Sequence, residues 1–283
     1  MHGLIFMTWE KYLAERFGRP FLSTYRAAIG ETHTDLPLAN RLYDDATLVA
    51  GVTAASELTG LPVDTLLREY GRYFILNGLT GHLCTYLLTQ VHSSRDLLLM
   101  MRDAHARLRH TLEGVAPPLF TYEASSRSNE VVLIYDSPRH LCSVLRGAIE
   151  GAAERYGEQV RVIERTCMKR GAPVCRFQAR FFAPSLALPE QLKTSEQVAR
   201  QKARKELTAL VLSLLPAVGT TGGLTLADIQ GILRQREDVR PHQLRPAVLL
   251  EALTQLQFAG LVMSTASQQG DDFARRCYWH VQT

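Results

Sequence analysis

Three polar side chains stand at alternate positions near the middle of the chain, in the stretch YDSPRHLCSVLRG. They are Tyr135, Ser137 and Arg139, and an apolar helical pattern follows them directly. In an extended segment, alternate side chains point to the same face. A guanidinium binds a carboxylate or phosphate through two parallel hydrogen bonds, and neighbouring hydroxyls complete the shell of the anion. The spacing favours an anion clamp over the alternative, the polar rim of a strand.

A histidine lies upstream of this clamp. His105 falls within DAHARLRHTLEGVAPPLF, a helical pattern that ends before Pro117 and Pro118. A helical histidine by itself is usually a partly buried polar residue. Together with a carboxylate clamp, however, it fits a metalloporphyrin, because the iron takes a histidine ligand and the two propionates cannot be buried unpaired.

Three cysteines raise a separate possibility. Cys142 follows the clamp, and Cys167 and Cys175 lie on the two arms of a predicted hairpin, where they could face each other. Three thiolates and one further ligand make a structural zinc site, and His140 is a conceivable fourth ligand. The alternative is a set of three buried thiols without a metal. Cys84 and Cys277 stand apart from this group.

The elements that must position these residues form two halves. Helical periodicity dominates as far as Pro117, in 4–18, 46–60, 62–79 and 95–114. Strand-like stretches follow at 119–125, 129–137, 159–167 and 172–182, with one helix at 139–157 and a glycine-containing hairpin turn within 165–175. This order predicts an α+β fold, with a helical subdomain followed by an antiparallel-sheet subdomain.

A smaller unit follows a charged linker. We expect residues 1–183 to form the first domain, 184–206 a linker helix that could also dimerise, and 207–283 a second domain. Three helical patterns and a terminal hairpin in this second domain resemble a winged helix-turn-helix. The polar residues of the predicted recognition segment are few, and only one of them is a strong phosphate partner: His242, Gln243, Arg245, Glu251 and Gln255. Arg275 and Arg276 in the hairpin could serve as a basic wing.

Composition narrows the class of protein. The chain has 283 residues, 46% of them hydrophobic, and a net charge of +4, which gives little support for nucleic acid as the main partner. No apolar run approaches the roughly 18 residues that span a bilayer, and the opening segment has no basic region typical of a signal peptide. We expect a cytoplasmic protein. The sequence has no Gly-rich phosphate loop and no acid pair at diagnostic spacing, so we do not expect an enzyme.

The first domain resembles the haem nitric oxide/oxygen-binding (H-NOX) family. The resemblance covers about residues 1–182 and rests on four segments: the opening MHGLIFMTWEKYLAERFG, the histidine segment, YDSPR and the terminal strand CRFQARF. It implies a fold that encloses haem b, with His105 as the proximal iron ligand and Tyr135, Ser137 and Arg139 on the propionates. Pro118 matches the proline that presses on the porphyrin and bends it.

The resemblance also implies which residues line the gas-binding face of the haem. Ile5, Trp9, Phe74 and Val144 match apolar pocket positions. Oxygen-binding members place a tyrosine donor where this chain has Val144, so we expect binding of nitric oxide and carbon monoxide but not oxygen. Nitric oxide weakens the bond opposite it, so release of His105 is a plausible signal.

Some members of the family carry zinc on cysteines in these positions together with a histidine, and Glu164 stands at that histidine's position. Strand parity places Glu164 and Cys167 on opposite faces unless a bulge intervenes. We therefore expect a haem-based gas sensor that relays its ligand state to the C-terminal domain, in control of transcription. The alternative is a gas-responsive adaptor whose C-terminal domain binds a signalling protein rather than DNA.

Overall fold

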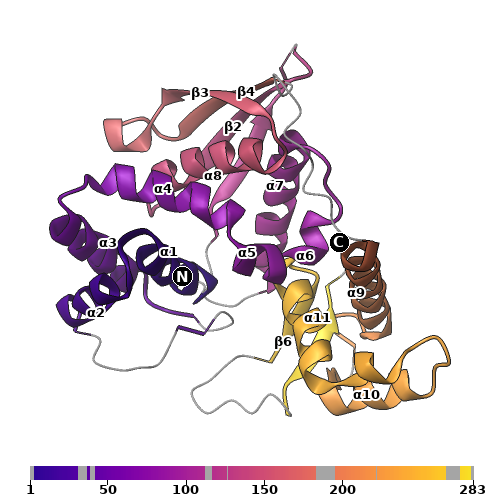
Figure 1. Ribbon diagram of the computed structural model, residues 1–283. Helices are drawn as coiled ribbons and strands as arrows, with labels where there is room; N and C mark the ends of the chain where they lie inside the picture. The colour runs from indigo at the N-terminus through magenta and orange to yellow at the C-terminus, as the bar shows by residue number, and fades with distance from the viewer. Residues whose placement is uncertain are drawn as a thin grey trace. The chain divides into compact units, whose positions relative to one another are not determined.

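A computed structural model describes residues 3–30, 37–38, 42–111, 117–125, 127–182, 195–220, 222–265 and 275–281. The chain forms two compact units (Figure 1). The first consists of residues 1–81, 92–102 and 115–186, and the second of residues 82–91, 103–114 and 187–283. The second unit therefore contains residues 82–91 and 103–114, which the predicted boundaries place in the first domain, 1–183.

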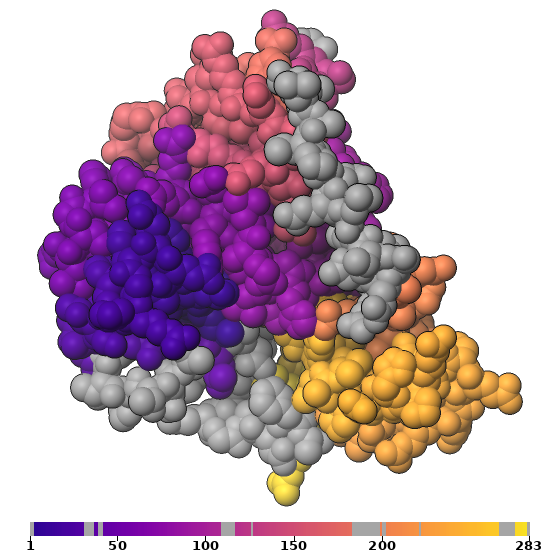
Figure 2. Space-filling view, in the orientation of Figure 1, coloured from indigo at the N-terminus to yellow at the C-terminus, as the bar shows by residue number. Residues whose placement is uncertain are grey.

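The first unit begins with four helices that enclose an aromatic core. They are α1 (Gly3–Phe17), α2 (Arg19–Ala28), α3 (Asp45–Thr59) and α4 (Val63–Leu76). Asp44 caps α3 by accepting a hydrogen bond from the Ala46 amide, and Gly60 ends it in the left-handed conformation. The predicted patterns correspond to α1, α3 and α4, and they did not include α2. These first helices appear in indigo to purple as one continuous surface in Figure 2.

Helices α4 and α8 (Cys142–Arg155) lie side by side at very short range (Figure 1). A Cβ placed on Gly71 of α4 would lie 2.0 Å from the Val144 carbonyl oxygen of α8. One on Gly147 of α8 would lie 1.9 Å from the Arg68 carbonyl oxygen. Glycine is needed at both positions because the two backbones touch directly. This contact fixes the spacing of the two helices that carry Phe74 and Val144.

A four-stranded antiparallel sheet completes the first unit. Its strands are β1 (Leu119–Glu123), β2 (Glu130–Asp136), β3 (Gln159–Thr166) and β4 (Cys175–Phe182), in the order β1-β2-β4-β3. The burial of β4 alternates strictly, so Cys175, Phe177, Ala179 and Phe181 face the core. Helix α8 packs on β3 and β4, and β3 and β4 form the predicted hairpin, whose turn contains a short 3₁₀ helix (Met168–Arg170) and Gly171 with φ of 86°.

The second unit combines two internal segments with the C-terminal residues. It includes the end of α5 (Gly78–Leu83), α6 (Thr85–Leu88) and the part of α7 (Ser94–Thr111) from Asp103 onward. The C-terminal elements are α9 (Ser195–Leu214), β5 (Leu224–Thr225), α10 (Leu226–Arg234), a 3₁₀ helix (Pro241–Leu244), α11 (Pro246–Phe258), β6 (Val262–Ser264) and β7 (Cys277–His280).

Three helices and a small antiparallel sheet of order β5-β7-β6 form the C-terminal part of this unit. Its core includes Leu207, Val211, Ile229, Leu253 and Tyr278. The predicted linker helix and first domain helix are one element, because α9 runs without a break to Leu214. The predicted basic wing is wrong for Arg276, which is only 3% exposed, and the hairpin turn at 269–272 lies outside the described residues.

Among the described residues, no single helix is both long and apolar enough to cross a membrane. Helices α3 and α4 reach the required length and hydropathy only as a pair bent by 110°. Both contribute buried residues to the aromatic core, as core helices of this composition do.

Candidate functional site

The clamp residues lie at the end of β2 and in the turn after it. Tyr135 and Ser137 are 3% and 2% exposed, and Tyr135 pairs across the sheet with Phe120 of β1 and Cys175 of β4. Burial raises the pKa of Tyr135 to about 12. The phenol therefore keeps its proton at neutral pH and can donate it in a hydrogen bond to an anion.

Alternation along a strand accounts for only part of this arrangement. Strand β2 ends at Asp136, and the amide of His140 donates to the Ser137 carbonyl oxygen at 3.2 Å, which closes a turn. The backbone amide of Arg139 donates to the Ser137 hydroxyl oxygen at 3.4 Å. The inference of one extended segment was therefore wrong for Arg139, which a turn positions.

Arg139 is already paired with a carboxylate. Its Nε donates to Asp45 Oδ2 at 2.6 Å, and the Arg139 side chain is only 14% exposed. Burial raises the pKa of Asp45, but the positive charge around it, led by the Arg139 guanidinium, outweighs this effect and holds that pKa below its usual value. The contact with Asp45, the first residue of α3, thus shows that the Arg139 guanidinium can bind a carboxylate at this place.

The predicted apolar pocket residues come together in one cluster. Trp9 is 1% exposed, and Ile5, Phe74 and Val144 pack half-buried against the cluster to which Trp9 belongs. The Trp9 ring meets Tyr70 edge-on at 5.2 Å between ring centres. These positions come from α1, α4 and α8, so the close α4–α8 contact sets the distance between Phe74 and Val144.

The hydroxyl groups of this cluster are bonded within the protein. Tyr70 Oη lies 2.8 Å from Thr8 Oγ1 and donates to the Ile5 carbonyl oxygen at 3.0 Å. Trp9 Nε1 donates to Tyr25 Oη at 3.1 Å. These interactions hold the aromatic side chains in fixed positions, and the apolar Phe74 and Val144 pack against the same cluster.

His105 and Pro118 lie on segments of different units. His105 is half-buried on α7, in the part of that helix that belongs to the second unit. Pro118 is half-buried and directly precedes β1 in the first unit. Both places agree with the predicted helix and strand, and each is determined within its own unit.

The three cysteines predicted as metal ligands meet in the first unit. Cys142 Sγ lies 3.8 Å from Cys167 Sγ, which lies 4.0 Å from Cys175 Sγ. All three side chains are buried. The distances are far longer than a disulfide bond of about 2.05 Å. They match the sulfur separation of about 3.8 Å that tetrahedral zinc with Zn–S bonds of about 2.3 Å requires.

Glu164 is the fourth member of this group, and a bulge puts it there. The ligand atoms of Cys142, Glu164, Cys167 and Cys175 all lie within 4.8 Å of one another. The register of β3 against β4 shifts between Glu164 and Thr166, which inserts one extra residue. That shift reverses the alternation, so Glu164 and Cys167 lie on the same side. The group thus contains Glu164 rather than the alternative fourth ligand His140.

Protons compete with a metal ion for these thiols. Burial, reinforced by Cys175, raises the pKa of Cys142 to about 12. Burial also raises the pKa of Cys175, although the Met168 amide donates to its sulfur at 3.2 Å and acts in the opposite direction. The Glu164 carboxylate lies 3.2 Å from Arg170. A cation that binds here must displace thiol protons.

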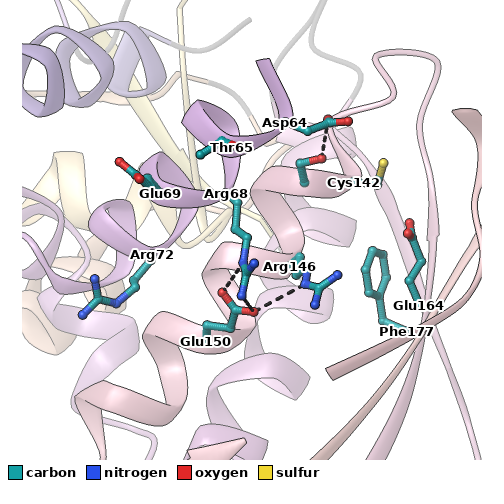
Figure 3. A pocket seen from close by; sticks show the side chains of 11 residues that line it. Asp64, Thr65, Arg68, Glu69, Arg72, Cys142, Arg146, Glu150, Glu164 and Phe177 are labelled. Carbon is teal, nitrogen blue, oxygen red and sulfur yellow. Dashed lines mark hydrogen bonds and ion pairs between the residues drawn. The ribbon is translucent and has the colours of Figure 1, made fainter. Parts of the chain in front are cut away.

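A charged groove of about 500 Å³ borders the cysteine group (Figure 3). Arg68 makes two hydrogen bonds of 2.7 Å to Glu150, which also accepts from Arg146 at 3.4 Å. Cys142 and Glu164 line the same groove, as Figure 3 shows. The guanidinium groups of Arg68 and Arg146 are thus paired, and Cys142 and Glu164 are the members of the cysteine group that border the groove.

The sequence did not indicate how closely the clamp and the cysteines are connected. Tyr135 stands opposite Cys175 in the sheet, and Cys142 begins the helix just after Arg139. The cysteine group therefore fixes the sheet and the helix on either side of the clamp turn. The register of β2 against β4 carries this relationship, and a sequence pattern alone does not determine that register.

Sequence comparison identifies the class of protein to which this fold belongs, a haem-binding sensor domain. The sequence model of the haem-NO-binding (HNOB) family matches residues 2–164. The chain therefore belongs to the haem-NO-binding, or H-NOX, family. Comparison with curated protein sequences gives no match.

Solved H-NOX structures share the fold. An H-NOX protein from S. oneidensis in the Fe(II)NO state has 20% identity and a TM-score of 0.58, over 65% of this chain and 100% of that one. An H-NOX mutant from T. tengcongensis has 22% identity and a TM-score of 0.58, over 66% and 100%. A mutant H-NOX domain from Shewanella oneidensis in the Fe(II)CO state has 20% identity and a TM-score of 0.55, over 64% and 98%.

Proposed function

We propose that this H-NOX chain senses nitric oxide and carbon monoxide, excludes oxygen, and relays the ligand state of its haem to the C-terminal helices. The observation that carries the proposal is the paired Arg139. Its Nε holds a carboxylate oxygen of Asp45 at 2.6 Å, and the buried Tyr135 and Ser137 precede it at the end of β2 and in the turn. This is the donor set that a haem propionate needs.

The residues present fit haem b on chemical grounds. Tyr135, Ser137 and Arg139 supply donors for the propionates, and burial keeps the Tyr135 phenol protonated. His105 would bind the haem iron, and Pro118 would contact the ring. When bound, the haem supplies an iron with one open position for a diatomic gas.

Apolar side chains support discrimination among gases. Bound oxygen gains negative charge that a nearby donor stabilises, whereas nitric oxide and carbon monoxide do not need one. Phe74 and Val144 cannot donate, and Tyr70 already donates to the Ile5 carbonyl oxygen. Related H-NOX structures have been solved with nitric oxide and with carbon monoxide.

The geometry of the cysteine group favours a zinc site over three buried thiols without a metal. The sulfur separations of 3.8 and 4.0 Å and the bulge that brings in Glu164 support a Cys₃Glu site. We assign this site a structural role, because three of its ligands are buried and the group adjoins the clamp turn.

The C-terminal elements support a winged-helix domain. Three helices and a sheet of order β5-β7-β6 follow the arrangement in which α11 would be the recognition helix. Transcriptional control is the favoured output, and binding of a signalling protein is the alternative, with α9 a candidate for dimerisation. We do not assign the chain an enzymatic activity of its own.

The experiment concerns His105. Wild-type protein should show a Soret band, and His105→Gly should lack it unless imidazole is supplied during expression. A second helical histidine, His82, provides a matched control in His82→Gly, which should keep the band. A native haem spectrum in His105→Gly would contradict the assignment. Selection on random DNA duplexes that enriches no sequence in either ligand state would favour the protein-partner alternative.

A further inference from the structure

One face of α11 is covered along its length by earlier parts of the chain. Glu251 and Gln255 lie one turn apart on this face, and Ala259 and Gly260 continue it into the turn before β6. We call these four residues the α11 stripe. From Val248 to Phe258, no side chain of α11 is exposed.

The first covering segment is the end of α5. Gln255 is 2% exposed, and its Nε2 donates to the His82 carbonyl oxygen at 3.3 Å. His82 Nε2 lies 3.4 Å from Glu251, which also pairs with Arg204 of α9. Tyr86 of α6 packs against the apolar core of the same unit. Glu251 and Gln255, two of the polar residues of the predicted recognition segment, are thus engaged by earlier parts of the chain and by α9.

The second covering segment is the helix that carries His105. Arg107 Nη1 donates to the Ala259 carbonyl oxygen at 3.4 Å. A Cβ on Gly260 would lie 2.4 Å from Arg107 Cβ and 3.0 Å from the Leu108 amide nitrogen. Gly260 also has φ of 67°. Only glycine meets both demands, because its backbone conformation is left-handed and the α7 backbone lies against it.

We propose that the α11 stripe is a docking surface for the His105 segment of α7, and that docking masks α11. A helix reads DNA through side chains that project into a groove, and α11 offers none beyond Ala247 while the stripe is covered. Arg107 follows His105 by two residues on one helix, so a displacement of His105 moves the contact at Gly260. This inference rests on the proposed function for its gas dependence, but the docking itself does not.

Linkage makes the docking testable from the C-terminal side. If loss of the His105 contact weakens docking by some free energy, then loss of docking must weaken the His105 contact by the same free energy. Gly260→Ala destabilises only the docked state, because its new Cβ would clash with Arg107 of α7. Gly222→Ala is the matched control, since Gly222 has φ of 72° but would place its Cβ in open space. Both substitutions introduce backbone strain, and only the first forces α7 away.

The experiment measures amide hydrogen exchange in haem-free and haem-loaded protein. In haem-free protein, Gly260→Ala should speed exchange in 103–108 and 248–258 together by at least tenfold, and Gly222→Ala should leave both segments unchanged. In haem-loaded wild type, nitric oxide should produce the same paired increase. Arg107→Ala, which removes the donor to Ala259, provides a second variant if Gly260→Ala does not fold.

Two results would overturn the inference. One is unchanged exchange of 248–258 in both Gly260→Ala and Arg107→Ala without haem. The other is unchanged exchange of that segment on addition of nitric oxide, in protein whose Soret band shows that haem is bound and has taken up the gas. Absence of a Soret band in the wild type would instead contradict the proposed function, and the haem-free comparison alone would then decide whether α7 docks on α11.

Discussion

Replacement of Gly71 by alanine should force α4 and α8 apart. The new Cβ would lie 2.0 Å from the Val144 carbonyl oxygen and 3.0 Å from the Ala148 amide nitrogen, whereas ordinary contact begins at 3.4 Å. The shortfall of about 1.4 Å falls on backbone atoms, which cannot rotate away as a flexible side chain can. Overpacking costs about 1–3 kcal/mol, and we expect the upper end here.

The helix propensity of alanine acts in the opposite direction. Alanine is about 1 kcal/mol better than glycine inside a helix, so the net loss of unfolding free energy should be about 2 kcal/mol. At a urea dependence of about 2 kcal/mol per molar, the midpoint should fall by about 1 M. Gly81→Ala is the control, since its Cβ would meet nothing within 4 Å, and it should be neutral or slightly stabilising.

Tryptophan fluorescence can follow this unit selectively. The chain has two tryptophans, Trp9 and Trp279, and Trp9 is 1% exposed in the aromatic core beside α4. Urea titrations of haem-free protein in a Trp279→Phe background would therefore report the unfolding of the first unit. Equal midpoints for Gly71→Ala and Gly81→Ala would refute the direct contact of the two backbones.

Three further predictions concern the clamp and the cysteines. Protein purified without added zinc should carry about one equivalent by metal analysis, lost in Cys167→Ser and on acidification, because protons compete for buried thiols such as Cys142; no zinc with five titratable thiols would contradict the site. Arg139→Ala should speed haem loss to apomyoglobin, since it leaves a propionate unpaired at a cost of about 1–3 kcal/mol, and an unchanged rate would count against the clamp. The raised pKa of Tyr135 means that stability is present below pH 10 and lost as pH rises from 10 to about 12, so Tyr135→Phe should flatten this part of the stability profile; a wild-type profile in that variant would show that the phenol is not the titrating group.

Local patterns predicted most elements of the first unit. The periodicity of α1, α3, α4, α7 and α8 and the alternation of β4 follow from side chains a few residues apart, which is the range over which a pattern carries information. Helix α2 did not appear in the prediction. Its segment, RPFLSTYRAA, is short but amphipathic, and Phe21, Leu22 and Tyr25 pack toward the aromatic core, so a weak pattern does not explain the omission.

The directions in which Glu164 and Arg139 point depend on irregularities of the backbone that the sequence pattern does not reveal. Parity along β3 argued against Glu164 as a partner of Cys167, and one extra residue in that strand removed the objection. The turn after Asp136 replaced the extended segment expected at Arg139. In each case a single backbone irregularity reverses which way a side chain points, and no pattern in the neighbouring residue types records it.

The association of the His105 segment with the C-terminal helices was also invisible to local patterns. The boundary expected at residues 183–184 follows a change in composition, whereas the contact of Arg107 with Ala259 joins residues far apart in the chain. Burial of Arg276 has the same origin, because the type and neighbours of an arginine indicate exposure until tertiary packing decides otherwise.

The absorption spectrum of the ferrous protein tests the central claim most directly. In air-equilibrated buffer the Soret band should stay that of the unliganded haem, and nitric oxide and carbon monoxide should each shift it, because Phe74 and Val144 offer no donor to bound oxygen. Val144→Tyr is the matched variant that would add one. A stable oxygen complex in the wild-type protein, or no Soret band at all, would contradict the account.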